Sequence, residues 1–440
     1  MKSHVFHRTP EKPLVAVSAK GLEITDAEGR VYLDGSGGAA VSCIGHGDPR
    51  VIEAMTRQAM TVDYAHTGAF TSEPAEALAA TLCAATTAPL DKAFIVGSGS
   101  EAVETAVKMA RGYHLARGDT GRFRVIARRQ SYHGNTLGAL GRGGHAARRE
   151  PFLPMLTEAH LVEPCFEYRH ALPGETPEAY GRRAADSLEA EIQRLGPETV
   201  SAFLAETVVG ATTGAVPPVP GYFARIREIC DRHGVLLIVD EVMCGVHRCG
   251  PFFAFEAEGI APDIVTLGKG LGGGYQPIAA AMCTAAVHDA FSAAGRSFVN
   301  GHTYMAHPVA CAAALKVQEI IREEQLGGQV GVMGALLRQR MEKRFAGHDA
   351  VGDIRGRGLF HAIELVAHRD SKRPFPASDG MAARVFEAAK DNGLLVYPGS
   401  GTADGTLGDH VLVAPPYNVT AEQIDRIVDR LGAAVDRVTA

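Results

Sequence analysis

The chain has 440 residues, of which 46% are hydrophobic and 21% are charged, and its net charge at pH 7 is −6. This composition is typical of a soluble globular protein, and the acidic balance gives no reason to expect nucleic acid or a membrane as a partner. We find no signal-peptide core, no apolar stretch long enough to span a bilayer, and no metal-binding spacing among the eight cysteines. We therefore expect a cytoplasmic protein with reduced thiols.

The first predicted elements are two short strands in LEITDAEGRVYLDGS, joined by a turn at Glu28-Gly29. The spacing of apolar residues then predicts helices in RVIEAMTRQAMT and EPAEALAATLCAAT. From residue 92 onward, short apolar strands alternate with helices, which is typical of an α/β fold around a mostly parallel sheet. The predicted strands are KAFIV, RVIARR, VSAFLAE, VLLIVDEV, DIVTLG and PIAAAMC, and the helices span residues 100–117, 177–195 and 222–233.

The order of elements changes after a predicted helix at residues 309–323. RGRGLFHAIEL, LLVYPG and HVLVAPP predict strands, separated and followed by helices at residues 381–392 and 421–439. This pattern indicates a smaller α+β domain, to which the N-terminal strands contribute. The expected division is an N-terminal segment of the small domain at 1–60, a large domain at 61–322 and a C-terminal small domain at 323–440.

A glycine turn follows the strand KAFIV. Gly97-Ser98-Gly99-Ser100 leads directly into a helical pattern, and such a helix N-terminus binds phosphate. The same residues resemble the dinucleotide fingerprint, and Arg128-Arg129 end the next strand, where dinucleotide folds read the ribose. An NADP-dependent oxidoreductase is therefore an alternative at this point. Otherwise Arg128-Arg129 and Arg148-Arg149 are interpreted as solvated surface pairs.

Two other strand ends favour a different cofactor. LLIVDEVMCGVHRCG places Asp240 and Glu241 at the end of an apolar strand, where carboxylates are costly unless paired or functional. DIVTLGKGLGGGYQP places Lys269 after another apolar strand, between two glycines. In a parallel sheet these ends meet the phosphate turn at one edge. A phosphate cradle, a carboxylate that keeps a pyridine nitrogen protonated and a lysine that forms a Schiff base are what pyridoxal 5′-phosphate (PLP) requires.

The motifs, taken together in order, resemble those of class III (omega-type) aminotransferases, which are PLP-dependent enzymes of fold type I. This resemblance implies a large domain whose mostly parallel sheet is flanked by helices and binds PLP, plus a smaller α+β domain. It covers nearly the whole chain. The matching segments are DAEGRVYLDGSGGAAVSCIGHGDPRV, GSGSEAVETAVKMAR, SYHGNTLGAL, LAETVVG, VDEVMCGVHRCG, TLGKGLGGGYQP, GHTYMAHPVACAAAL and GDHVLVAPPYNVT.

The resemblance implies how the cofactor ring is held. Tyr132 stacks on the pyridine ring with His133 beside it, and Val242 packs against the opposite face. Asp240 pairs with the ring nitrogen, and Glu206 lies close to the cofactor.

The resemblance also implies that Gly99 and Ser100 bind the phosphate through the helix N-terminus. Thr303 stands where the family reaches the phosphate of the neighbouring subunit, which implies a homodimer with shared active sites.

The implied reaction is a ping-pong transamination. A donor amine displaces Lys269, whose free amine then moves a proton between Cα and C4′, and a 2-oxo acid reverses the sequence. Met243 resembles the amine–pyruvate branch of the family, so pyruvate is the favoured acceptor. Ala39 and Ala40 stand where amine-type members often have a bulky aromatic residue, which implies a roomy pocket. An amino-acid racemase or epimerase of the same family is the alternative.

One departure from the family concerns the substrate carboxylate. Many members place an arginine where this chain has Tyr397, and residues 393–416 contain no lysine or arginine. The loop at 399–407 is also longer than in members that have the arginine. The expected pocket therefore lacks the usual carboxylate clamp. Other cations that can compensate are Arg142, Arg148 and Arg355.

Overall fold

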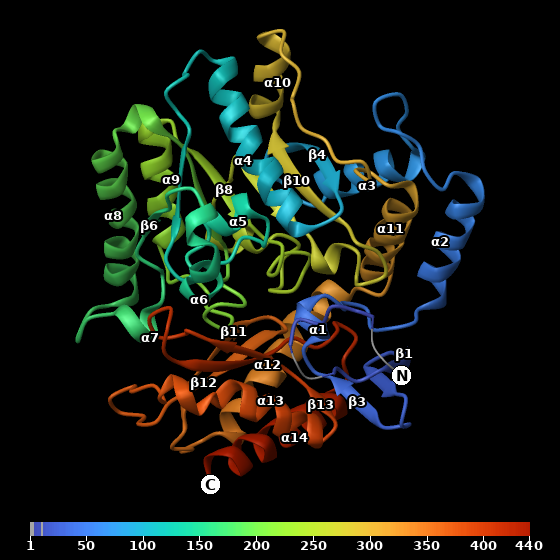
Figure 1. Ribbon diagram of the computed structural model, residues 1–440, viewed down its shortest axis with the longest axis vertical. Coiled ribbons are helices and arrows are strands. Elements are labelled where there is room, and N and C mark those ends of the chain that lie inside the picture. The colour runs from blue at the N-terminus through green and yellow to red at the C-terminus, as the bar shows by residue number, and fades with distance from the viewer. Residues whose placement is uncertain (1–3, 10–11) are drawn as a thin grey trace.

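The protein is described here by a computed structural model, which covers residues 4–9 and 12–440 (Figure 1). Within these residues the strands form one seven-stranded sheet and two four-stranded sheets. The seven-stranded sheet and its helices make up the upper part of Figure 1, and the two smaller sheets lie below it. No helix in the described part of the chain is both long and apolar enough to cross a membrane.

The large sheet has the order β4-β10-β9-β8-β7-β5-β6. All neighbouring pairs from β9 to β6 are parallel, and β10 alone runs antiparallel to its neighbours β9 and β4. Every residue of β7, β8, β9 and β10 is buried, as expected for apolar strands covered on both faces. The strands are β4 (Leu90–Val96), β5 (Arg124–Arg128), β6 (His160–Val162), β7 (Val200–Glu206), β8 (Leu236–Asp240), β9 (Ile264–Leu267) and β10 (Ala279–Thr284).

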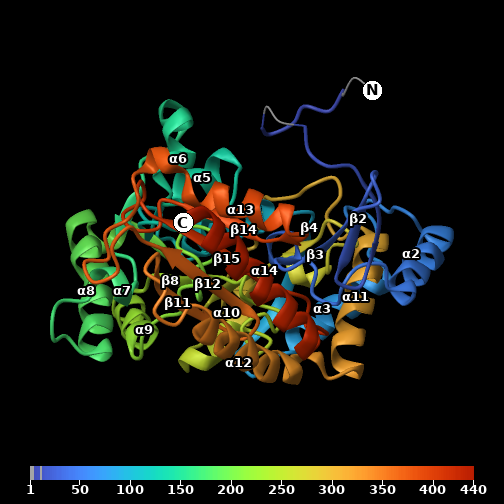
Figure 2. The same cartoon turned by 90° about the horizontal axis from the view of Figure 1, so that it is seen from below.

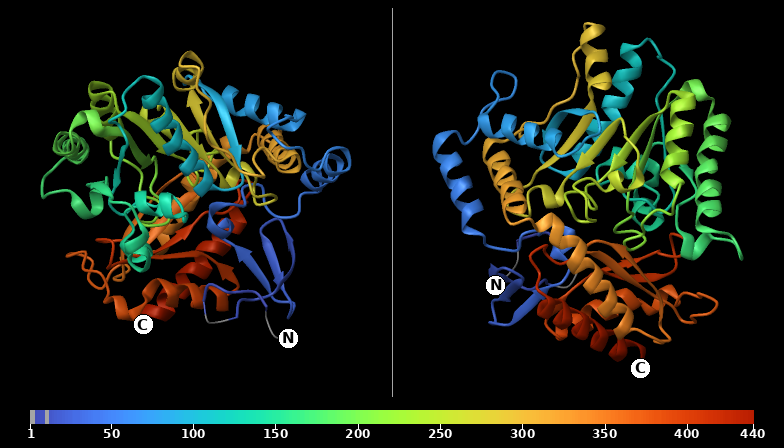
Figure 3. Two further views of the ribbon diagram at one scale, coloured as in Figure 1. Left: turned by 45° about the horizontal axis from the view of Figure 1, so that its top comes forward. Right: turned by 180° about the vertical axis from the view of Figure 1, so that it is seen from behind.

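Helices cover both faces of this sheet, as Figure 1 and the rear view in Figure 3 show. The helices of this part are α2 (Pro49–Thr61), α3 (Glu73–Ala84), α4 (Gly99–Ala116), α5 (Leu137–Arg142), α6 (Ala146–Arg149), α7 (Glu167–His170), α8 (Pro177–Leu195), α9 (Tyr222–His233), α10 (Ala285–Ala293) and α11 (Pro308–Glu323). The strand-to-helix alternation brings the carboxyl ends of the parallel strands to one edge of the sheet.

The two smaller sheets combine residues from both ends of the chain. In one, the N-terminal strands are joined by a C-terminal strand that pairs in parallel through Leu33 and Leu394. The other is antiparallel with the order β11-β12-β15-β14. The elements are β1 (Ala16–Lys20), β2 (Glu23–Asp26), β3 (Val31–Asp34), α1 (Gly37–Ala40), β11 (Val351–Arg357), β12 (Phe360–Leu365), β13 (Leu394–Leu395), β14 (Tyr397–Ser400) and β15 (Asp409–Val413).

Three helices pack together beside these smaller sheets, as seen from below in Figure 2. They are α12 (Leu326–Arg344), α13 (Met381–Asp391) and α14 (Ala421–Thr439). The amphipathic α14 contacts both of the others and buries Ile424, Ile427, Val428, Leu431 and Val435.

The predicted fold class is confirmed, and one long helix was missed. The sequence analysis predicted no element at residues 326–344, where α12 forms a 19-residue helix. Its four glycines disfavour an isolated helix. One of these glycines, Gly334, is required for packing, because a Cβ there would collide with the main-chain oxygen of Gly358 in the turn between β11 and β12. The domain boundaries at residues 60 and 322 stay a prediction.

Candidate active site

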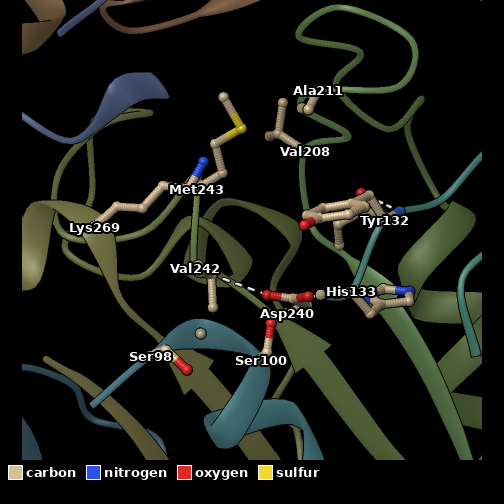
Figure 4. Close-up of a pocket in the computed structure, with 14 residues that line it drawn as sticks. Ser98, Ser100, Tyr132, His133, Val208, Ala211, Asp240, Val242, Met243 and Lys269 are labelled. Atoms are coloured by element: carbon tan, nitrogen blue, oxygen red, sulfur yellow. Dashed lines mark hydrogen bonds and ion pairs between the residues drawn. The ribbon is translucent and has the colours of Figure 1, made fainter. Parts of the chain in front are cut away.

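A cavity of about 200 Å³ lies at the edge of the large sheet where the parallel strands end. In the view of Figure 4, Lys269 lies on one side of this space and Tyr132 on the other, with Asp240 and Val242 between them. All but one of the predicted site residues line the cavity: Gly99, Ser100, Tyr132, His133, Glu206, Asp240, Val242 and Lys269.

The predicted phosphate turn forms the N-terminus of α4, an 18-residue helix that points at the cavity (Figure 4). The side chain of Ser98 accepts a hydrogen bond from the amide of Glu101 and so caps the helix. A Cβ on Gly99 would lie 2.8 Å from Cγ1 of Val242, so only glycine fits this close approach. The remaining N–H groups and the helix dipole make this end suitable for an anion.

Asp240 ends β8 with its carboxylate held by three donors. Oδ1 accepts from the Val242 amide at 3.1 Å and from Oγ1 of Thr266 at 3.0 Å. Oδ2 lies 2.8 Å from Nδ1 of His133, and because a carboxylate only accepts, this nitrogen must carry the hydrogen. These bonds stabilise a buried carboxylate in a fixed orientation facing the cavity.

Glu206 ends the neighbouring strand β7. Its Oε1 accepts from the Tyr132 amide at 3.2 Å, and burial raises the pKa of its carboxyl group. The buried Arg128 donates to the main-chain oxygen of Glu206 and lies 3.6 Å from its Oε2. Arg128 therefore points into the protein, so its interpretation as a solvated residue or a ribose-reading group is wrong.

Lys269 follows β9 in a left-handed backbone conformation, with φ of 45°. This conformation costs a non-glycine residue about 1–2 kcal/mol, and such costs are concentrated at functional sites. Nζ donates to the main-chain oxygen of Ala39 at 2.9 Å. Burial lowers the pKa of the Lys269 amine to about 8, against the opposing effect of Asp240. A substantial fraction of this amine is therefore neutral and nucleophilic near pH 8.

Glu241 faces away from the cavity although it adjoins Asp240. Its carboxylate accepts from Oγ1 of Thr207 and from the amides of Ala254 and Phe255, each at 2.7 Å. Burial raises the pKa of Glu241 to about 7. This residue therefore anchors the segment after β8, while Asp240 serves the cavity.

Thr303 is the predicted site residue that lies outside the cavity. It is exposed and lines a separate hollow, together with Gly97 and Glu101 from the start of α4 and Tyr304. The hydroxyl of Tyr64 donates to its main-chain oxygen at 3.1 Å. Thr303 is thus on the surface beside the phosphate turn.

Several residues of the site were not predicted as site residues. The segment after β7 contributes Val208, Gly210 and Ala211, and no side chain in it has a chemical signature that marks a site. The contact of Ala39 with Lys269 uses a main-chain oxygen, which leaves no trace in the sequence. Arg148 is half-buried and lies over the Tyr132 ring, with its guanidinium carbon 4.6 Å from the ring centroid, a contact that the sequence did not predict.

The residues present fit PLP. The glycine-framed helix N-terminus suits its phosphate, the space between Tyr132 and Val242 suits a flat ring, and the oriented carboxylate of Asp240 suits a protonated ring nitrogen. The buried amine of Lys269 suits the cofactor's aldehyde.

Comparisons with known proteins agree with this fit. The family model described as aminotransferase class-III matches residues 6–435. An uncharacterized aminotransferase of Schizosaccharomyces pombe, C1771.03c, is 44% identical, and the match covers 100% of this chain and 96% of that protein. Gamma aminobutyrate transaminase 3, chloroplastic, of Solanum lycopersicum is 35% identical, with 98% and 82% covered.

Solved structures give the same result. The crystal structure of an (S)-enantioselective omega-transaminase from Thermomicrobium roseum is similar with a TM-score of 0.93 and 34% identity, covering 100% of this chain and 97% of that chain. A PLP-bound amine transaminase from an uncultivated Pseudomonas species is similar with a TM-score of 0.93 and 33% identity, covering 99% of each chain.

Proposed function

Because this chain belongs to the class III aminotransferases, which depend on PLP, we propose that it transfers an amino group from an amine or amino acid to pyruvate in preference to other 2-oxo acids. Membership of this family excludes the NADP-dependent oxidoreductase considered above. The observation that carries the proposal is that the buried amine of Lys269 and the carboxylate of Asp240 line one cavity at the start of α4.

Each of the residues around the cavity has a defined part in this proposal. When bound, PLP supplies an electron sink that stabilises negative charge at the substrate Cα. Gly99 and Ser100 would hold its phosphate, and Tyr132 and Val242 would lie on the two faces of its ring. Asp240 would accept a hydrogen bond from the protonated ring nitrogen, and the hydrogen bond from His133 holds the carboxylate in its orientation.

Lys269 has two tasks in this proposal. Its amine would hold the cofactor between turnovers, and once displaced by a donor it would remove the proton from the substrate Cα. The lowered pKa of about 8 supports both tasks, because each requires the neutral amine. The strained φ angle fixes where the amine reaches the cavity.

The preference for pyruvate is inferred from Tyr397. This half-buried ring packs against an apolar cluster that includes Ala40 and Val208, with Met243 beside it. Residues 393–416 contain no cation. A substrate with a second carboxylate therefore finds no guanidinium on this side of the cavity, whereas pyruvate needs none.

We also infer a homodimer whose two copies share their active sites. Exposed aromatic side chains lie next to Thr303, since Tyr304 has 66% and Tyr64 has 38% of its surface exposed. Tyr64 packs against Tyr304 with ring centroids 5.9 Å apart. Exposed apolar residues gathered at one place are typical of an interface, and a second copy here would bring its Thr303 toward the partner's phosphate site.

The proposed compartment is the cytoplasm. All eight cysteines are free, and seven of them are buried. Free thiols persist in reducing compartments.

A substrate screen tests the proposed reaction. Purified protein saturated with PLP is incubated with pyruvate and a panel of amines and amino acids, and alanine formation is measured. We expect alanine from at least one donor. If no donor yields alanine while a chiral amino acid loses its optical activity, the racemase or epimerase alternative replaces the proposal.

A further inference from the structure

Tyr397 leaves open which cation binds the substrate carboxylate. Arg355 on β11 is unavailable, because its buried guanidinium is already bonded. It donates to Oε2 of Glu364 at 2.6 Å, to Oδ2 of Asp353 at 2.9 Å and to the main-chain oxygens of Thr213 and Gly214. Taking Arg355 from these partners would break all four of these bonds and leave the buried carboxylate of Glu364 with Arg169 as its remaining cationic partner.

Arg142 is also a poor candidate. It ends α5, where burial lowers the pKa of its guanidinium and the charge of Glu104 opposes that shift. Glu104 is engaged with α5 itself, since its Oε1 accepts from Thr136 and from the Ala139 amide. Glu104 is therefore committed to α5, and its charge acts on the buried Arg142 without an ion pair between them in the described residues.

Arg148 differs from both because it contacts a residue that lines the cavity. Among the described residues it has no ion pair, and no side chain or main-chain oxygen accepts a hydrogen bond from its guanidinium. Its contact is with the ring of Tyr132, which lines the cavity, at 4.6 Å from guanidinium carbon to ring centroid. Its charge also contributes to the lowered pKa of Lys269, so its field reaches the reactive amine. A half-buried cation without an ion pair thus lies directly beside a ring that lines the cavity.

The long loop at 399–407 packs against Gln130 and the short helix α6. Nε2 of Gln130 donates to the main-chain oxygens of Gly401 at 3.3 Å and Thr402 at 2.9 Å. A Cβ on Gly405 would lie 3.9 Å from Cβ of Ala146 in α6. The loop at 399–407, which supplies no arginine itself, therefore abuts the helix that carries Arg148.

We propose that Arg148 binds the carboxylate of the 2-oxo acid acceptor from the Tyr132 side of the cavity. The planar guanidinium presents two parallel N–H groups that match a carboxylate, and stacking on Tyr132 restricts its orientation. One guanidinium binds one carboxylate, so this role favours a monocarboxylic acceptor such as pyruvate. The inference rests on the proposed transamination.

Acceptor specificity tests this role. Arg148→Gln, Arg148→Lys and the adjacent control Arg149→Gln are compared with wild type, using one donor amine that has no carboxylate and either pyruvate or butanal as acceptor. We expect the ratio of kcat/KM for pyruvate to that for butanal to fall at least tenfold in Arg148→Gln, about 1.4 kcal/mol, mainly through KM. Arg148→Lys should retain part of the ratio, because lysine keeps the charge but lacks the two parallel N–H groups of arginine. Arg149→Gln should leave the ratio unchanged.

A binding measurement separates this inference from the proposed reaction. Propanoate has the carboxylate of pyruvate and no carbonyl to react, so its dissociation constant from the PLP-loaded enzyme is measured by calorimetry. We expect at least tenfold weaker binding in Arg148→Gln. If kcat/KM in Arg148→Gln falls equally for pyruvate and for butanal while propanoate binding is unchanged, Arg148 only supports Tyr132 and the inference is overturned. If wild type transfers no amino group to pyruvate, the proposed reaction fails, and propanoate binding still decides the role of Arg148.

Discussion

Replacing Asp240 by asparagine keeps the shape of the side chain and removes its charge. The amide oxygen can keep the bonds from Val242 and Thr266, but the amide nitrogen then faces the N–H of His133. Either two donors oppose each other, or His133 changes its tautomer. The ring nitrogen of the cofactor meanwhile loses a charge-assisted partner, a bond that contributes about 1.5–3 kcal/mol.

If that contribution is made in the transition state for removal of the Cα proton, the rate falls roughly 10- to 150-fold. The assay is the single-turnover rate of the PLP-loaded Asp240→Asn variant with a saturating donor, followed by absorbance. Thr266→Val is the matched control, because it removes one donor to the same carboxylate and leaves the charge. A near wild-type rate in Asp240→Asn, with PLP bound, would refute the role given to this carboxylate.

Four other outcomes are expected. Lys269→Ala should abolish turnover, and borohydride reduction of wild type followed by mass spectrometry should locate the cofactor on Lys269; an adduct on Lys92, Lys108 or Lys316 contradicts the assignment. Because a pKa of about 8 makes the amine neutral as pH rises, the rate of PLP uptake by the apoenzyme should increase with pH and level off above 8, whereas an inflection near 10.5 contradicts the lowered pKa. Sedimentation should show a dimer whose activity falls on dilution to monomers, and a fully active monomer would exclude a role for Thr303 across an interface. The value of kcat/KM for 2-oxoglutarate should be about tenfold or more below that for pyruvate with the same donor, and the reverse preference would show that a second cation binds the distal carboxylate.

The sequence predicted helices best where their ends have chemical signals. The boundaries of α8 and α14 agree with the prediction because Thr176 and Thr420 cap their first turns, with Pro177 next to the first cap. The missed α12 has no capping side chain and holds four glycines, of which Gly334 allows close packing against a turn that is distant in sequence. Local propensity cannot report such a tertiary contact.

The same contrast applies to the site. Asp240, Glu206 and Lys269 were predictable because each ends an apolar strand of a parallel sheet, and such ends converge. The position of Arg148 was not predictable, because it lies in a four-residue helix that packs against the loop at 399–407, a segment distant in sequence. Two adjacent carboxylates also took opposite directions, since alternate residues of an extended chain face opposite ways: Asp240 toward the cavity and Glu241 into the protein.

The bond from Lys269 to the oxygen of Ala39 is made to the backbone, so it survives any side chain at position 39 that keeps the loop's path. Ala39 is half-buried and has an ordinary φ of −121°, whereas the neighbouring Ala40 is buried with φ of 60° and tolerates less change. A substitution at position 39 can therefore change the side chain while the reactive lysine keeps its contact. This part of the loop is in this way free to vary around an amine that the backbone holds in place.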